Sequence, residues 1–287
     1  MSANLSKPQQ WQTNTLRWHI IHTIATQQSR DTLFGWGIYI TAAVSVGIAA
    51  LLIFNSTRFV GESSLNIVAQ PFMLPLQAAL TLVILFVAIE ATLSIARPRE
   101  QGSLQVLFFA PIDEPIFIGG NFLAGLLSYI LFVLLTLPIL LLLAWSTNFV
   151  IPTQLLWATI PTLFVVGVTI AFGLVVSAAA PSARTAVLIL VAGILILLGL
   201  QSAYAALLNI PPTSRFYDAL LFIRTILANL QTILSWFSPF RMLDVILTAS
   251  LNNDWLVLIR QLGIALVTTA IWLFTAVRML RRRGVLP

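Results

Sequence analysis

Arg97 to Pro115 reads RPREQGSLQVLFFAPIDEP and gathers five charged residues between two long apolar runs. The runs cover 72–96 and 116–145, and each exceeds the roughly 20 residues with which a helix crosses about 30 Å of hydrocarbon. We therefore interpret the stretch as a loop between two membrane spans. Pro98 predicts that the first of these spans ends at Arg97, because the residue before a proline is disfavoured in the α-helical conformation.

The loop contains a segment with helical periodicity, 103–110, which lies between Gly102 and Pro111. Its apolar residues at helical spacing are Leu104, Leu107 and Phe108. This pattern predicts a short amphipathic helix whose apolar face needs a partner. The alternative is an ordinary loop whose apolar side chains rest on lipid headgroups.

The composition of the whole chain is that of an integral membrane protein. Hydrophobic residues make up 59% of it and charged residues 8%, with a mean hydropathy of +0.98, whereas about a quarter of the residues of soluble domains are charged. The net charge of +6 does not indicate a nucleic-acid partner, because the basic residues are scattered at the edges of apolar runs. Lys7 is the single lysine and Pro8 follows it, so the chain cannot supply a phosphate-binding GxxxxGK[ST] loop.

The expected fold is an all-α integral membrane protein with six transmembrane helices. The expected spans are 33–54, 72–96, 116–145, 155–180, 186–208 and 255–279. Residues 1–32 precede them and carry Trp11 and Trp18, which suggests a helix lying in the membrane interface. Residues 280–287 form a basic tail.

The longest connection, between spans five and six, contains another apolar segment, 216–237. Arg224 near its middle argues against a seventh span, so we expect helices that lie at the outer leaflet or dip into it.

Six spans place both termini on one side of the membrane, and the basic residues indicate which side. The ten on that side are Lys7, Arg17, Arg30, Arg97, Arg99, Arg184, Arg278, Arg281, Arg282 and Arg283. The five opposite are Arg58, Arg215, Arg224, Arg241 and Arg260. The positive-inside rule then predicts cytoplasmic termini and a cytoplasmic Arg97 to Pro115 loop in a cell inner (plasma) membrane.

Glu90 is the one carboxylate inside an expected span. A charge there costs a few kcal/mol, on the order of 3, unless it is paired or protonated. Arg97 lies seven residues later on the same helix face, so pairing with Arg97 is the simplest interpretation. The alternative is a gate or a substrate contact.

The loop resembles a motif of a known family. Arg99, Glu100, Gly102, Ser103, Leu104, Leu107 and Pro111 match the pattern E-x-G-[ST]-L-x-x-L-x-x-x-P after a basic residue. That pattern is similar to the first cytoplasmic loop of type 2 ATP-binding-cassette (ABC) transporter permeases. Gln105 and the pair Asp113-Glu114 depart from it, where the family more often has an acidic residue and a less acidic turn.

The resemblance implies a function and a set of partners. In this family the loop is a coupling helix that docks on a separate ATPase subunit, and the N-terminal interfacial helix is an elbow helix. Two permeases, identical or related, join two ATPase subunits, and the pair exports an amphiphilic or lipid-like substrate. The implied coupling residues are Arg97, Arg99, Glu100, Gly102, Ser103, Leu104, Leu107, Phe108 and Pro111. This chain would then be no enzyme itself and would bind no metal or cofactor, because ATP and Mg²⁺ belong to the ATPase.

Two other classes of protein fit the sequence less well. An ion- or proton-coupled carrier would be expected to have chains of intramembrane acids, and Glu90 alone is a poor relay. A membrane-embedded enzyme would need paired acid-base or metal-binding side chains, and the spans contain no histidine or cysteine.

Overall fold

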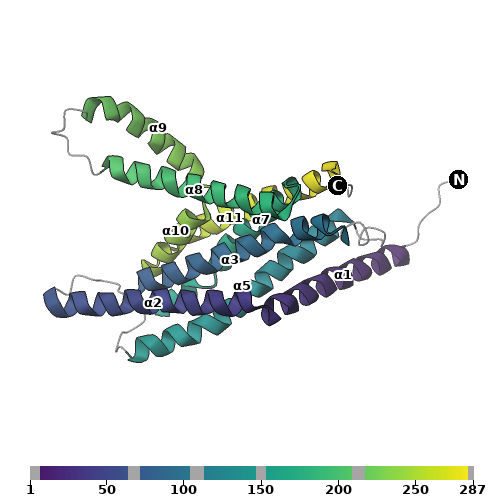
Figure 1. Ribbon diagram of the computed structural model, residues 1–287, viewed down its shortest axis with the longest axis horizontal. Coiled ribbons are helices and arrows are strands. Elements are labelled where there is room, and N and C mark those ends of the chain that lie inside the picture. The colour runs from purple at the N-terminus through teal and green to yellow at the C-terminus, as the bar shows by residue number, and fades with distance from the viewer. Residues whose placement is uncertain (1–6, 64–71, 104–112, 147–152, 209–216, 284–287) are drawn as a thin grey trace.

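The computed structural model describes residues 7–63, 72–103, 113–146, 153–208 and 217–283, and these residues form helices with no strand among them (Figure 1). The helices are α1 (Lys7–Phe34), α2 (Trp36–Ser63), α3 (Met73–Glu100), α5 (Glu114–Ser146), α6 (Thr153–Ala158), α7 (Thr162–Ala179), α8 (Ala183–Leu208), α9 (Tyr217–Ser235), α10 (Pro239–Leu251) and α11 (Trp255–Arg283).

Six helical segments in the described ranges are long and apolar enough to cross a membrane. They are Trp36–Asn55, Met73–Glu100, Glu114–Ser146, Thr153–Ala179, Ala183–Leu208 and Trp255–Arg282. Each overlaps one of the ranges expected from hydropathy, and the fourth is built from α6 and α7 on either side of Pro161. The expectation of an all-α, multi-pass membrane architecture is therefore confirmed.

Helix α7 lies at the centre of the bundle, where α3, α5, α8, α10 and α11 pack against it. Its small residues allow this close packing. A Cβ atom on Gly173 would lie 3.0 Å from the backbone oxygen of Ala88 on α3. At the contact between α5 and α7, a Cβ on Gly125 of α5 would lie 2.9 Å from Cδ1 of Ile170 on α7. Neighbouring helices thus approach α7 at distances that larger residues would not permit.

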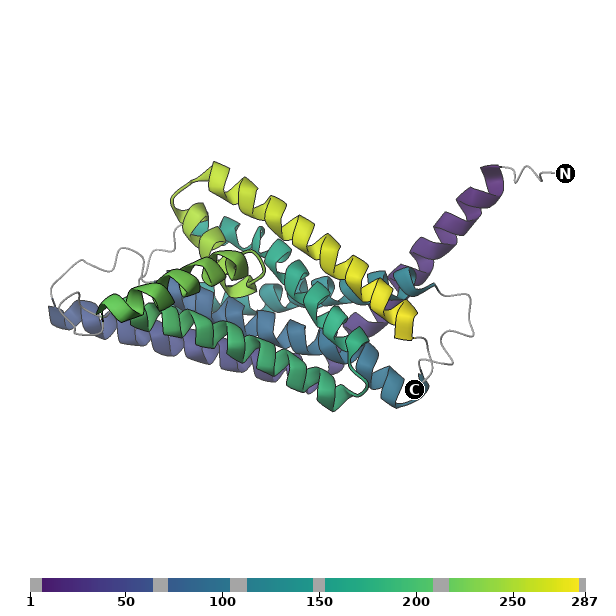
Figure 2. The same cartoon turned by 90° about the horizontal axis from the view of Figure 1, so that it is seen from above.

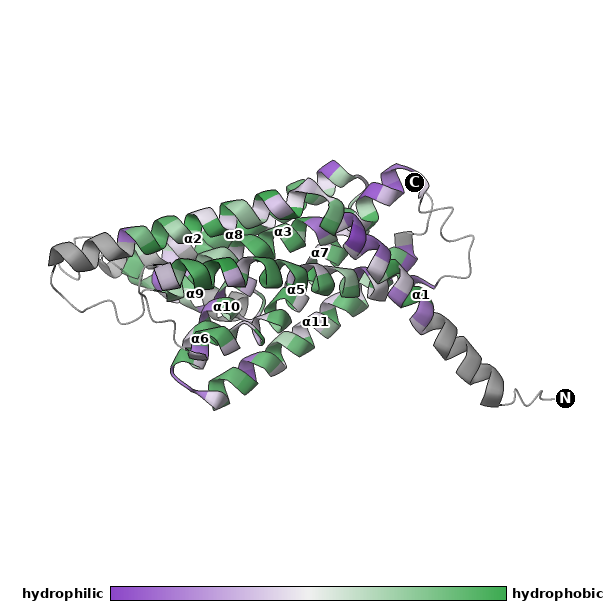
Figure 3. Cartoon of the chain, turned by 90° about the horizontal axis from the view of Figure 1, so that it is seen from below, coloured by the Kyte–Doolittle hydropathy of each residue, from purple (hydrophilic) through white to green (hydrophobic). Residues whose placement is uncertain are grey.

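Helices α2, α8 and α11 expose long apolar surfaces. Exposed side chains include Leu51 on α2, Leu188, Leu195 and Ile196 on α8, and Leu266, Val267 and Phe274 on α11. Figure 3 shows hydrophobic residues along these helices, while hydrophilic residues gather toward the helix ends. Such surfaces suit lipid or another apolar chain better than water.

Helix α1 projects from one end of the bundle (Figure 2) and packs against α5. Ile24 fits over Gly120, where an added Cβ would come within 2.8 Å of the isoleucine Cγ2. Trp18 on the same helix is exposed. The helix expected before the first span is therefore present, and its placement in the membrane interface stays a prediction.

The connection between the fifth and sixth span-like helices contains α9 and α10. Helix α9 packs on α8 and is not among the six segments that meet the length and hydropathy of a span. Helix α10 packs on α6, α7 and α11 through its buried face, which includes Met242, Leu243, Ile246 and Leu247. That these helices lie at the outer leaflet stays a prediction.

Candidate functional site

The end of α3 differs from the sequence expectation, because the helix continues through Pro98 to Glu100 and does not end at Arg97. Proline removes one backbone donor and crowds the preceding turn, so a helix that contains it needs support from neighbours. The helix stops where Gly102 adopts a φ of 73°, the left-handed conformation with which glycine commonly ends helices. The stop signal is therefore Gly102, and the expected end at Arg97 was wrong.

Ser177 on α7 supports α3 just before the proline. Its Oγ accepts hydrogen bonds from the backbone N–H groups of Ile95 at 3.2 Å and Ala96 at 3.0 Å. All three residues are buried. A hydroxyl from the central helix thus joins α7 to the backbone of α3 in the turn before Pro98.

Arg99 reaches from α3 to the end of α7. Its Nη1 donates to the carbonyl oxygen of Ala180 at 2.8 Å and to that of Ala178 at 3.2 Å. The last carbonyls of a helix lack partners within the helix and carry the negative end of its dipole. The guanidinium of Arg99 donates hydrogen bonds to these carbonyls and places a positive charge at the negative end of the dipole. The contact is partly buried.

Glu100, the next residue, contacts the beginning of α8. Its Oε2 accepts a hydrogen bond of 3.1 Å from the backbone N–H of Ala183. A carboxylate is favourable there, because the first N–H groups of a helix are unpaired and carry the positive end of its dipole. Adjacent residues of opposite charge thus hold the two sides of the α7–α8 turn. We call Arg99, Glu100 and Ser177 the anchor residues.

The other flank of the loop is also attached to the bundle. Glu114 begins α5, and its Oε2 lies 3.8 Å from Nη2 of Arg281 on α11. The arginine side chain is 68% exposed, so this ion pair is screened and contributes at most about 1 kcal/mol. The ion pair shows that the start of α5 lies beside the basic end of α11.

The predicted coupling residues fall into four groups. Arg99 and Glu100 belong to the anchor residues, while Gly102 and Ser103 are exposed at the start of the loop, where Ser103 Oγ donates to the Pro98 carbonyl at 3.2 Å. Arg97 lines the cavity that also contains Glu90. The remaining four, Leu104, Leu107, Phe108 and Pro111, lie outside the described residues, and so does the predicted amphipathic helix.

Glu90 and Arg97 line a cavity of about 1020 Å³ bounded by α1, α2, α3 and α5. Asp31 of α1 contributes a second carboxylate to its wall. Glu90 is partly buried, and the charge of Arg97 acts on it through space. Among the described residues no ion pair within 4.0 Å joins Glu90 and Arg97, so their direct pairing stays a prediction. The cavity also leaves room for a polar ligand group beside Glu90.

Ser177 and the carbonyls of Ala178 and Ala180 were not predicted as part of the site. The sequence shows a run of small residues, Ser177 to Ala180, followed by Pro181, which indicates a helix end and a turn. Nothing in that pattern indicates that α3 supplies the partner, because the contacts join residues about 80 positions apart.

No protein-family model matches the chain, and neither does any curated protein with which it was compared.

Proposed function

We propose that this chain is the permease subunit of a type 2 ABC exporter, in which a separate ATPase subunit drives transport by contact with the loop between α3 and α5. The observation that carries the proposal is the attachment of that loop. Its sequence matches the coupling motif of the family, and the residues that precede the motif hydrogen-bond to the ends of α7 and α8.

The anchor residues give such a loop a mechanical route into the membrane helices. A displacement of the loop would act through Arg99 and Glu100 on the α7–α8 turn, and α7 packs against five other helices. On the other flank it would act on α5 and, through Glu114, on α11. Coupling of this kind requires two positions of the loop that nucleotide in the ATPase populates differently.

A second permease, identical or related, completes the proposed assembly with two ATPase subunits. The apolar faces of α2, α8 and α11 are exposed in the single chain and suit lipid or a helix partner. An amphiphilic or lipid-like substrate fits a pathway built from aliphatic, aromatic and hydroxyl side chains. In this assembly ATP and Mg²⁺ bind the ATPase, and both termini of the permease are cytoplasmic.

Purification of the tagged chain from its native membrane, with and without its partners, tests this function. We expect the isolated chain to have no ATPase activity and the co-purified complex to hydrolyse ATP and to transport in reconstituted vesicles. Transport by the isolated chain under a proton or ion gradient would instead support a secondary carrier. The observation that favours this alternative is the position of Glu90 in the wall of a cavity. ATP hydrolysis by the isolated chain would contradict both.

A further inference from the structure

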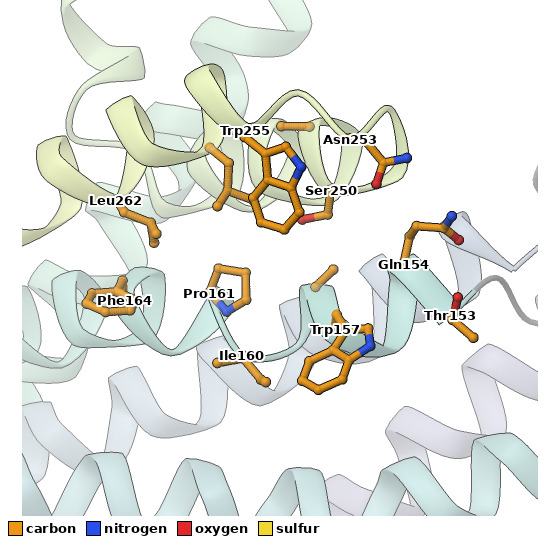
Figure 4. A pocket seen from close by; sticks show the side chains of 13 residues that line it. Thr153, Gln154, Trp157, Ile160, Pro161, Phe164, Ser250, Asn253, Trp255 and Leu262 are labelled. Carbon is orange, nitrogen blue, oxygen red and sulfur yellow. The ribbon is translucent and has the colours of Figure 1, made fainter.

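A second cavity, of about 350 Å³, lies at the opposite end of the bundle from the anchor residues. It is open on one side and is bordered by α6 and the start of α7, and by the end of α10 and the start of α11 (Figure 4). A volume of this size is within the range of ligand pockets, about 300–1,000 Å³. The side chains around it are predominantly apolar.

The polarity of the cavity wall changes along its length. Thr153, Gln154 and Asn253 lie at one end, and Phe164 and Leu262 at the other (Figure 4). Along α11 at 1.5 Å per residue, Leu262 lies about 10 Å deeper than Trp255. The cavity thus runs from a polar mouth near the helix ends to an apolar floor within the span.

Two exposed tryptophans stand beside the mouth. Trp157 of α6 is 71% exposed and Trp255 of α11 is 68% exposed, and both line the cavity. Tryptophan side chains in membrane proteins favour the headgroup level, where an apolar ring and a polar N–H are both satisfied. The mouth is therefore at the depth where the glycerol and ester groups of lipids are found.

Ser250 of α10 provides an independent indication that a ligand belongs here. Its Oγ is buried in the cavity wall and has no hydrogen-bond partner among the described residues. A buried hydroxyl without a partner is costly, so Ser250 Oγ requires an explanation, such as a bound water or a ligand. An acceptor supplied by the ligand would remove this cost.

We propose that the cavity binds one acyl chain of an ester-linked glycerolipid from the leaflet opposite the C-terminal arginines. The chain lies between Phe164, Leu258 and Leu262, and its ester carbonyl accepts a hydrogen bond from Ser250 Oγ. A water molecule would satisfy Ser250 but would leave the apolar floor unfilled. The ligand would hold the α6–α7 segment against α10 and α11, whatever the function of the loop at the other end.

Photo-crosslinking in vesicles tests the location of the chain. The purified protein is reconstituted with a phosphatidylcholine that carries a diazirine on one acyl chain, and the labelled peptides are mapped by mass spectrometry. We expect adducts at Phe164, Leu258 and Leu262 in excess over Leu188 and Leu195, which are exposed on α8. Leu262→Trp should remove most of this excess, whereas Leu266→Trp, one turn further on the exposed face, should leave it unchanged.

A comparison of lipid linkages tests the polar contact. Ser250→Ala removes the hydrogen-bond donor without adding bulk, so this variant should fold even if Leu262→Trp does not. Wild-type protein should retain an ester-linked lipid about 2- to 10-fold better than its ether-linked analogue, because a net hydrogen bond to the carbonyl is lost. Ser250→Ala should abolish that preference. Labelling of the cavity no greater than that of α8, or an equal ester preference in Ser250→Ala, would overturn the proposal.

Discussion

Arg99 is the side chain through which the end of α3 holds the central helix. Its contacts to the carbonyls of Ala178 and Ala180 are charge-assisted, and hydrogen bonds to a charged group are among the stronger ones in proteins. The neighbouring Glu100 makes the complementary contact at α8, so both sides of one turn depend on consecutive residues.

Arg99→Met should destabilise the protein, because it keeps the apolar stem and leaves two helix-end carbonyls without this donor. We expect a loss of about 1–3 kcal/mol in the free energy of unfolding, measured by tryptophan fluorescence in detergent. Arg282→Met is the matched control, since Arg282 is exposed near the end of α11. Equal stability of the two variants would show that the contact at the α7 end contributes nothing.

Glu100→Ala should act on coupling more than on assembly. The carboxylate contacts the first residue of α8 from the exposed rim of the site, so its loss costs about 1 kcal/mol and leaves the bundle intact. In the proposed complex we expect normal binding of the ATPase and a lower ratio of transport to ATP hydrolysis. An unchanged ratio would remove Glu100 from the coupling route.

The sequence identified some of these residues and not their partners. Arg99 and Glu100 could be selected because charges are scarce in this chain and both match the loop motif. Ser177 could not, since a serine near a helix end is common and its role depends on a distant helix. Polar contacts within a bundle are set by packing, which hydropathy does not report.

At the scale of the helices, the crossing of α3 and α7 depends on Gly173. Gly173→Val should destabilise the protein by about 1–3 kcal/mol, because the backbone of α3 cannot move away from an added Cβ without disturbing the bundle. A Cβ there would also lie 3.0 Å from Cβ of Ala91. Gly263→Val on α11 is the control, since a Cβ there meets no described atom within 4 Å. If thermal unfolding in detergent gave equal midpoints, the close approach would not be essential.

Hydropathy predicted the six long helices because each must bury an apolar length fixed by the membrane. It failed at the end of α3, where Pro98 indicated a stop. The helix nevertheless persists to Glu100 and ends at Gly102, and Ser177 and Arg99 join it to α7 on either side of the proline. Local rules for proline assume a helix without such neighbours. The packing of α1 over Gly120 could not be predicted either, because hydropathy does not show which helices are neighbours.

At the scale of the whole molecule, the account requires the loop to face the cytoplasm. The sequence contains no cysteine, so single introduced cysteines report their side of the membrane cleanly. We expect cysteines at Ser103 and Arg283 to be shielded from an impermeant thiol reagent in intact cells, and one at Ser214 to be labelled. Labelling at Ser103 would place the loop out of reach of any cytoplasmic ATPase. Labelling at Arg283 alone would indicate that 216–237 crosses the membrane.

The most direct measurement is the amount of ATPase that co-purifies with the tagged chain from the native membrane. Three proteins are compared: wild type, Leu104→Asp in the motif, and Gln105→Asp, which introduces the same charge at a position where the family often has an acid. We predict that wild type and Gln105→Asp retain the ATPase and that Leu104→Asp loses it while inserting normally. Full retention by Leu104→Asp, or no ATPase with wild type, would contradict the account.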